Sequence, residues 1–185
     1  MKRISIIGLS LIIWGLGWRV AQAAPPNLGS SFKEWCLQQS SLSASLRKTV
    51  EVLLERTGTS NCSQADEILS SLTNLFLGGN QITDVSPLSS LTNLTELKLA
   101  RNQITDVSPL SSLTNLTELK LWDNQITDIS PLSSLTNLTE LSLNYNQITD
   151  VSPLSSLTNL TWLDFQDNPI AQPTCPVSSR NVCSF

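Results

Sequence analysis

Histidine is absent from this chain of 185 residues, and methionine and tyrosine occur once each. The chain therefore lacks the side chain that most often serves as general base or metal ligand. It also contains no glycine-rich phosphate loop and no nucleophile motif. Glu118 and Asp164 could be paired as acid and base, but an open sheet face would not desolvate either carboxylate. We predict a protein that is not an enzyme and has no cofactor.

Charged residues are scarce, at 14% of the chain, and acidic residues outnumber basic ones by 15 to 11. Three of the basic residues, Lys2, Arg3 and Arg19, lie within the first 23 positions. A chain without that segment is strongly acidic, and its field would repel the phosphates of nucleic acid. We therefore predict no nucleic-acid partner.

Long apolar runs are missing except near the start, where Ile4 to Trp18 follow two basic residues. This run is too short for a transmembrane helix, and Ala21-Gln22-Ala23 has the small-x-small pattern of a cleavage site. We predict that residues 1–23 are a secretory signal peptide. The mature protein is then secreted or periplasmic, with no transmembrane segment.

A period of 22 residues organises most of the remaining sequence. Asparagine recurs with this step at Asn80, Asn102, Asn124, Asn146 and Asn168, inside the same frame of apolar residues. Leu97 and Leu99 of the second copy point to one face of an extended segment. Stacking the copies at about 4.8 Å joins these faces into one core. The period predicts an α/β solenoid with a short parallel sheet on its concave side.

The polar columns of the repeat have structural explanations. An asparagine amide at the end of each strand can satisfy backbone donors and acceptors. Each Ser-Pro pair, such as Ser108-Pro109, places a capping hydroxyl before a residue suited to the start of a helix. We therefore predict short helical or 3₁₀ turns on the convex side.

The aspartates that precede these pairs are Asp84, Asp106, Asp128 and Asp150. They could collect calcium, but holding the turn explains them better, and we predict no metal site.

In this 22-residue pattern of leucine and asparagine, the chain resembles bacterial leucine-rich repeat proteins of the internalin-like class, whose repeat unit has the same length. The resemblance covers about Leu72 to Ile170 and is carried by the leucine and asparagine columns. It implies a role in recognition, by analogy with that fold.

The four cysteines of an exported chain indicate two disulfides. Cys36 and Cys62 precede the repeats, whereas Cys175 and Cys183 follow them. Stacked strands separate the two groups by about 20 Å, beyond the limit of about 7 Å for bridged Cα atoms. We predict the pairs Cys36–Cys62 and Cys175–Cys183.

Both ends of a solenoid need covers, because its core would otherwise meet water. Apolar periodicity predicts two helices, over 31–39 and 43–56, that cover the first coil. At the other end, Phe165 replaces the leucine of earlier copies and helps to close the core. We divide the chain into a signal peptide (1–23), an N-terminal helical cap (24–66), leucine-rich repeats (67–170) and a C-terminal disulfide cap (171–185).

The copies differ mainly at strand positions that point away from the core. Aromatic and basic residues gather there, and exposed aromatic rings indicate a binding surface. The predicted ligand-binding residues are Phe76, Lys98, Arg101, Lys120, Trp122, Tyr145 and Trp162. We predict a recognition module that binds an unknown protein, peptide or glycan through this face. Alternatively, a solvated face varies freely after duplication, and the protein is a structural surface or envelope protein without a discrete ligand.

Overall fold

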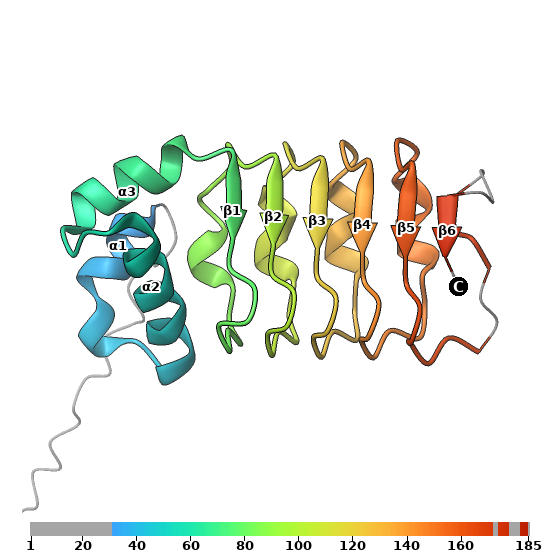
Figure 1. Ribbon diagram of the computed structural model, residues 1–185, viewed down its shortest axis with the longest axis horizontal. Coiled ribbons are helices and arrows are strands. Elements are labelled where there is room, and N and C mark those ends of the chain that lie inside the picture. Colours follow the sequence, from blue (N-terminus) through green and yellow to red (C-terminus); the bar gives the residue numbers. More distant parts are fainter. Residues whose placement is uncertain (1–30, 172–173, 178–181, 185) are drawn as a thin grey trace, which may run out of the picture.

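The computed structural model describes residues 31–171, 174–177 and 182–184, and within them the chain forms a solenoid (Figure 1). The predicted signal peptide lies outside these residues. Six parallel strands form one sheet in chain order. They are β1 (Asn74–Phe76), β2 (Glu96–Lys98), β3 (Glu118–Lys120), β4 (Glu140–Ser142), β5 (Trp162–Asp164) and β6 (Cys183–Ser184). The predicted repeat solenoid with a parallel sheet is confirmed.

The strands pair in the register that the sequence period requires. Leu97 of β2 lies beside Leu75 of β1 and Leu119 of β3, so residues one period apart are neighbours. The leucines of these columns have no solvent exposure in the middle of the solenoid, as Leu97 and Leu99 show. One continuous apolar core therefore runs along the axis. The same register places the outward side chains of successive copies in straight columns.

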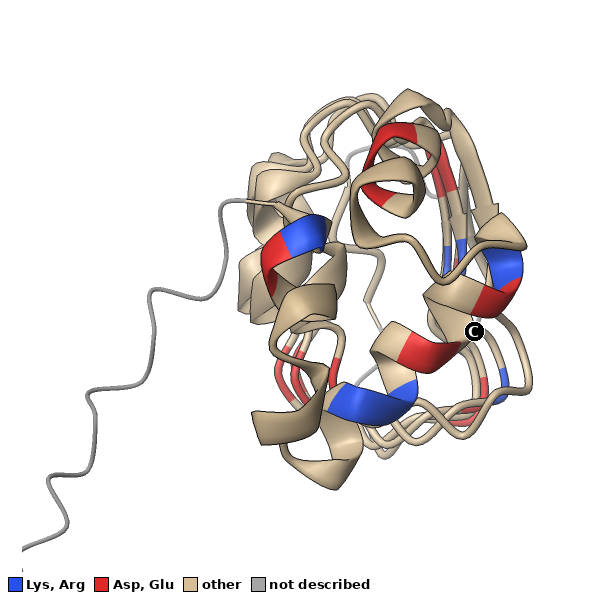
Figure 2. Ribbon diagram, turned by 90° about the vertical axis from the view of Figure 1, so that its left-hand side faces the viewer, with Lys and Arg blue, Asp and Glu red and all other residues tan. Residues whose placement is uncertain are grey.

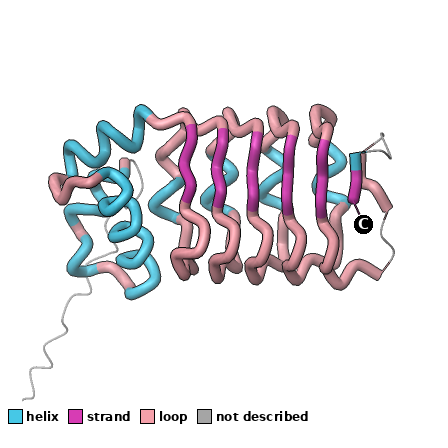
Figure 3. Tube along the Cα trace, viewed as in Figure 1, coloured by secondary structure: helices cyan, strands magenta, loops and turns pink. Residues whose placement is uncertain are grey.

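Short 3₁₀ helices form the side opposite the sheet (Figure 3). They are η2 (Ser86–Leu88), η3 (Ser108–Ser112), η4 (Ser130–Ser134) and η5 (Ser152–Ser156). The predicted turns are confirmed, but capping by the serine hydroxyl is wrong. In η3 the residue before the helix is Val107, which supplies no capping side chain, and Ser108 is already helical. The Asp106 carboxylate instead accepts a hydrogen bond from the Ser108 N–H at 2.8 Å, which confirms its predicted role in the turn.

The asparagine column ties neighbouring coils together. The Asn124 amide donates to the carbonyl oxygens of Leu121 at 2.9 Å and Leu99 at 3.1 Å. Its Oδ1 accepts from the Ile104 N–H at 3.0 Å. Because both ends of the amide are used, the strand can end inside the molecule without unpaired backbone groups. The predicted structural role is confirmed.

Three further columns of polar side chains also form hydrogen bonds between neighbouring coils, and these were not predicted. The Thr117 hydroxyl donates to the Thr95 carbonyl oxygen at 3.0 Å. The Asn115 amide donates to the Thr92 carbonyl oxygen at 2.9 Å, and the Ser134 hydroxyl to that of Ser111 at 2.9 Å. The polar side chains that are the same in every copy thus form hydrogen bonds between coils. This structural role explains why these positions do not differ between the copies.

Three α-helices cover the first coil, as the end-on view shows (Figure 2). They are α1 (Phe32–Leu37), α2 (Ala44–Thr57) and α3 (Cys62–Ser71), with a 3₁₀ turn η1 (Gln39–Ser41) between the first two. α1 and α2 match the two predicted helices, whereas α3 was not predicted. The disulfide Cys36–Cys62 joins α1 to α3, with Cα atoms 5.6 Å apart. The Thr49 hydroxyl of α2 donates to the Asp84 carbonyl oxygen at 2.6 Å, which fixes the helices to the first coil.

The C-terminal end is closed by one more strand. Phe165 occupies the leucine position and is 2% exposed. β6 then pairs with β5 in parallel, with Cys183 beside Leu163. The disulfide Cys175–Cys183 holds this short strand, with Cα atoms 5.8 Å apart. Both predicted disulfides are present, but the added strand was not predicted.

Among the described residues, no helix has the length and apolar character needed to cross a membrane.

Candidate functional site

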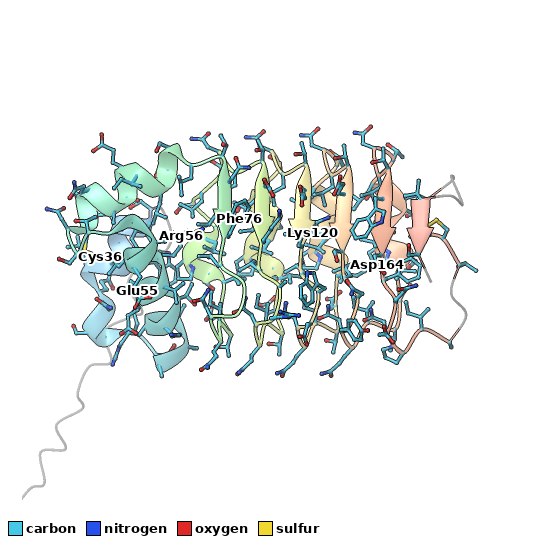
Figure 4. The ribbon with its side chains drawn as sticks, in the orientation of Figure 1. Cys36, Glu55, Arg56, Phe76, Lys120 and Asp164 are labelled. Carbon is cyan, nitrogen blue, oxygen red and sulfur yellow. A yellow bond between two sulfur atoms is a disulfide. The ribbon has the colours of Figure 1, made fainter. Side chains whose placement is uncertain are left out.

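The predicted binding residues project from the sheet or from the segment that follows each strand. We call this surface the strand face. It comprises the outward positions of β1 to β5 and the positions two residues after each strand. Figure 4 labels Phe76 of β1, Lys120 of β3 and Asp164 at the end of β5 along it. The next residue of each copy forms a rim, made of Gly79, Arg101, Asp123, Tyr145 and Asp167.

Three predicted aromatic anchors are exposed on these surfaces. Tyr145 is 56% exposed, Phe76 is 43% exposed and Trp162 is 37% exposed. Trp122 lies among them and is partly buried. Contiguous exposed apolar patches are more typical of interaction surfaces than of the remaining protein surface.

The basic residues are less available than the sequence suggested, because both lysines are held by carboxylates. Lys98 Nζ lies 3.5 Å from a Glu118 carboxylate oxygen and also pairs with Glu96. Lys120 Nζ lies 2.9 Å from Glu140 and 3.5 Å from Glu118. The hydrogen bond from Lys98 lowers the pKa of Glu96 and, reciprocally, raises the pKa of Lys98. The ion pairs form one chain across three strands and neutralise the lysines.

Each basic residue also lies over an aromatic ring. Lys98 Nζ is 4.8 Å from the centre of the Phe76 ring, and Lys120 Nζ is 4.2 Å from that of Trp162. The guanidinium carbon of Arg101 is 4.6 Å from the ring centre of Trp122. These distances lie within the range of cation–π attraction. The cations therefore help to hold the rings in position.

The rim has a strained backbone. Arg101, Asp123, Tyr145 and Asp167 all have φ between 55° and 58°, the left-handed region, and Gly79 has φ 73° in the first copy. Glycine adopts this conformation freely, whereas arginine and tyrosine rarely do. The glycine in this column was the signal in the sequence that the position is left-handed.

Carboxylates surround Tyr145, although none of them is among the predicted binding residues. Backbone hydrogen bonds from Asp123 to Asn144 and from Tyr145 to Gln166, both 3.0 Å, set the neighbouring rim positions side by side. Asp123 and Asp167 therefore flank Tyr145. The negative charge of Asp167 raises the pKa of Tyr145, and a hydrogen bond with Asp167, partial burial and the charges of Asp164 and Asp123 add to the effect. The predicted basic surface is thus acidic at its C-terminal half.

The N-terminal cap also reaches the strand face. Arg56 and Glu55 of α2, together with Phe76 and Asn80, line a shallow cavity of about 190 Å³ beside β1 (Figure 4). This contribution was not predicted, because α2 lies outside the repeats and its position beside β1 depends on how the cap packs. The cap thus contributes two charged side chains next to Phe76 at the N-terminal end of the sheet.

Known proteins share this architecture. The family model described as leucine-rich repeats in two copies matches residues 70–112, 114–156 and 136–174. Internalin C2 of Listeria monocytogenes is 34% identical, with a TM-score of 0.58, and the match covers 77% of this chain and 55% of that one. A leucine-rich repeat protein of Leptospira interrogans is 34% identical, with a TM-score of 0.53, over 56% of this chain and 27% of that one. The chain thus spans about half the length of the first structure and about a quarter of the second. A comparison with curated protein sequences finds no match.

Proposed function

The chain belongs to the leucine-rich repeat family and is similar to bacterial internalins, and from this premise we propose that it is an extracytoplasmic recognition module that binds another protein or peptide. The binding surface in this proposal is the strand face with its rim. The observation that carries it is the gathering of exposed rings, Phe76, Tyr145 and Trp162, on one side of the solenoid. Aromatic residues of this kind supply most of the energy at protein interfaces.

An exported location supports this role. Both cysteine pairs are bridged, which suits an oxidising compartment. The sequence of residues 1–23 has the pattern of a signal peptide. We propose a binding protein rather than an enzyme, because the chain has no histidine and the carboxylates of the strand face lie on an open surface.

One observation favours the alternative, a structural surface or envelope protein without a discrete ligand. The lysines of the strand face already have carboxylate and ring partners within the molecule. With these internal partners, the charged groups of the strand face need no ligand and can remain in contact with water alone. The rings favour binding, because Phe76 and Trp162 remain exposed beside their lysines and Tyr145 has no cation partner among the described residues.

A peptide display library, selected on the exported and oxidised chain, distinguishes these functions. The test variant is Trp122→Ala with Trp162→Ala, and the matched control is Leu37→Ala, which removes an exposed apolar residue of the cap that is 65% exposed. A recognition module yields peptides that bind the wild type and the control, and that lose at least about tenfold in affinity for the test variant. Thermal unfolding of all three proteins checks that they remain folded. A structural protein yields no peptides, or peptides whose affinity does not depend on the two tryptophans.

A further inference from the structure

We propose that the surface around Tyr145 binds a lysine or arginine side chain from an extended basic segment of a partner protein. This inference rests on the proposed function and specifies the chemistry of the partner. It places a cation over the Tyr145 ring, between the carboxylates of Asp123 and Asp167.

The lysines of the strand face are neutralised, whereas the aspartates near Tyr145 are not. Lys98 of β2 and Lys120 of β3 pair with three glutamates. On the rim and at the end of β5, Asp123, Asp164 and Asp167 take part in no ion pair among the described residues. The net field around Tyr145 is therefore negative, as the raised pKa of its hydroxyl also indicates. A positively charged partner complements this end of the surface.

Cations already lie over aromatic rings on this surface, and one of these contacts involves a rim residue. Two coils before Tyr145 on the rim, Arg101 lies over the Trp122 ring at 4.6 Å. Tyr145 is also a rim residue and is 56% exposed, and no cation–π contact within the described part of the chain involves it. A guanidinium or ammonium group of a partner can take the corresponding place over the Tyr145 ring. The flanking carboxylates would then add charge-assisted hydrogen bonds.

A metal ion fits this surface less well than a side chain. Asp123 and Asp167 lie one coil on either side of Tyr145, so their backbones are about 10 Å apart at the usual strand spacing. Calcium requires several oxygen ligands at about 2.4 Å from one point. A lysine or arginine extends along the surface and needs only one carboxylate at a time. No group of three acidic or cysteine side chains in the described residues is placed to hold a metal.

The size of the surface favours an extended segment over a globular domain. Five strands at about 4.8 Å and about 14 Å of strand length give roughly 340 Å² before side-chain relief. A standard interface between folded proteins uses about 800 Å² on each side. A short extended segment can place one cation at Tyr145 and an apolar residue against Trp162 within that smaller area.

The test measures the affinity of labelled eight-residue peptides for the exported, oxidised chain by fluorescence anisotropy. The probes alternate glycine with arginine, glutamate or serine. We expect binding of the arginine peptide alone, and a loss of about fivefold in affinity with Asp123→Asn plus Asp167→Asn. Asparagine tolerates the left-handed backbone, so these variants keep the fold. Tyr145→Asn should weaken binding by about threefold through loss of the ring.

The matched control is Glu51→Gln with Glu67→Gln, which changes the net charge equally at exposed positions of α2 and α3. We expect it to change affinity by less than about twofold, because it lies away from the rim. Equal losses in both double variants would show attraction to the overall charge and overturn the proposal, as would failure of the arginine peptide to bind. If displayed peptides depend on Trp122 and Trp162 but carry no basic residue, the proposed function stands and this inference fails. If no peptide depends on the strand face, both fail.

Discussion

Arg101 and Trp122 lie on neighbouring coils and form one stacked pair, with the guanidinium 4.6 Å from the ring centre. The pair holds an aromatic side chain in place on the strand face. Because Arg101 has a positive φ, the backbone is strained where this contact is made. The same left-handed conformation recurs at the rim position of every copy, so it belongs to the geometry of the repeat.

We predict that this pair couples energetically. In a double-mutant cycle of Arg101→Ala and Trp122→Ala, the two changes together should destabilise less than the sum of the single changes, by about 0.5–1 kcal/mol. Urea unfolding of the four proteins measures this coupling. A coupling within about 0.2 kcal/mol of zero would show that the contact contributes nothing to stability.

We predict a large loss of stability when the asparagine column is interrupted. Asn124 is 8% exposed, and its side chain bonds to the backbones of Leu99, Ile104 and Leu121. Asn124→Ala leaves these groups unpaired, so the free energy of unfolding should fall by about 3 kcal/mol. The matched control is Asn115→Ala, an exposed asparagine whose amide donates to Thr92, where the loss should be about 1 kcal/mol. Similar losses at both positions would contradict the role assigned to burial.

The two disulfides should contribute unequally. The bridge Cys36–Cys62 closes a separation of 26 residues, whereas Cys175–Cys183 closes one of 8. Loop entropy then predicts losses of about 3.5 and about 2.5 kcal/mol when each pair is changed to serine. Chemical unfolding of the two variants, compared with the oxidised wild type, measures both values. A larger loss for the C-terminal pair would show that native contacts of β6, rather than loop length, determine its contribution.

The repeated part of the fold could be predicted because one period sets strand register, core and asparagine column together. Residues outside the period were harder to predict. The Cys183–Ser184 strand is too short for any pattern to mark it, and its position depends on the disulfide. α3 had a signal that was missed, since Asn61 accepts hydrogen bonds from Ser63 and Gln64 as an N-cap.

The structure places the predicted residues on the strand face and its rim, but it adds charges that the prediction left out. Register places Lys98 beside Lys120, and from this alone the face looks basic. The glutamates on the same strands, such as Glu118, lie two residues away and reach the lysines only through side-chain rotamers. Rotamers depend on local packing and not on the period, so the sequence alone could not show the neutralised lysines.

Tyr145 provides a direct probe of the electrostatics of the rim, because it is the single tyrosine of the chain. Its pKa is raised, chiefly by the negative charge of Asp167, since a second negative charge on the phenolate is unfavourable there. Asp167→Asn removes that charge and should lower the pKa of Tyr145 toward its ordinary value near 10.0. Ultraviolet absorbance of the phenolate during alkaline titration measures the change without interference from another tyrosine.

Glu51→Gln, on the exposed side of α2, should leave the titration unchanged, since screening by salt removes the influence of a distant charge. A titration that does not respond to Asp167→Asn would mean that the carboxylate points away from the ring, and the proposed cation site would lose one of its two flanking charges.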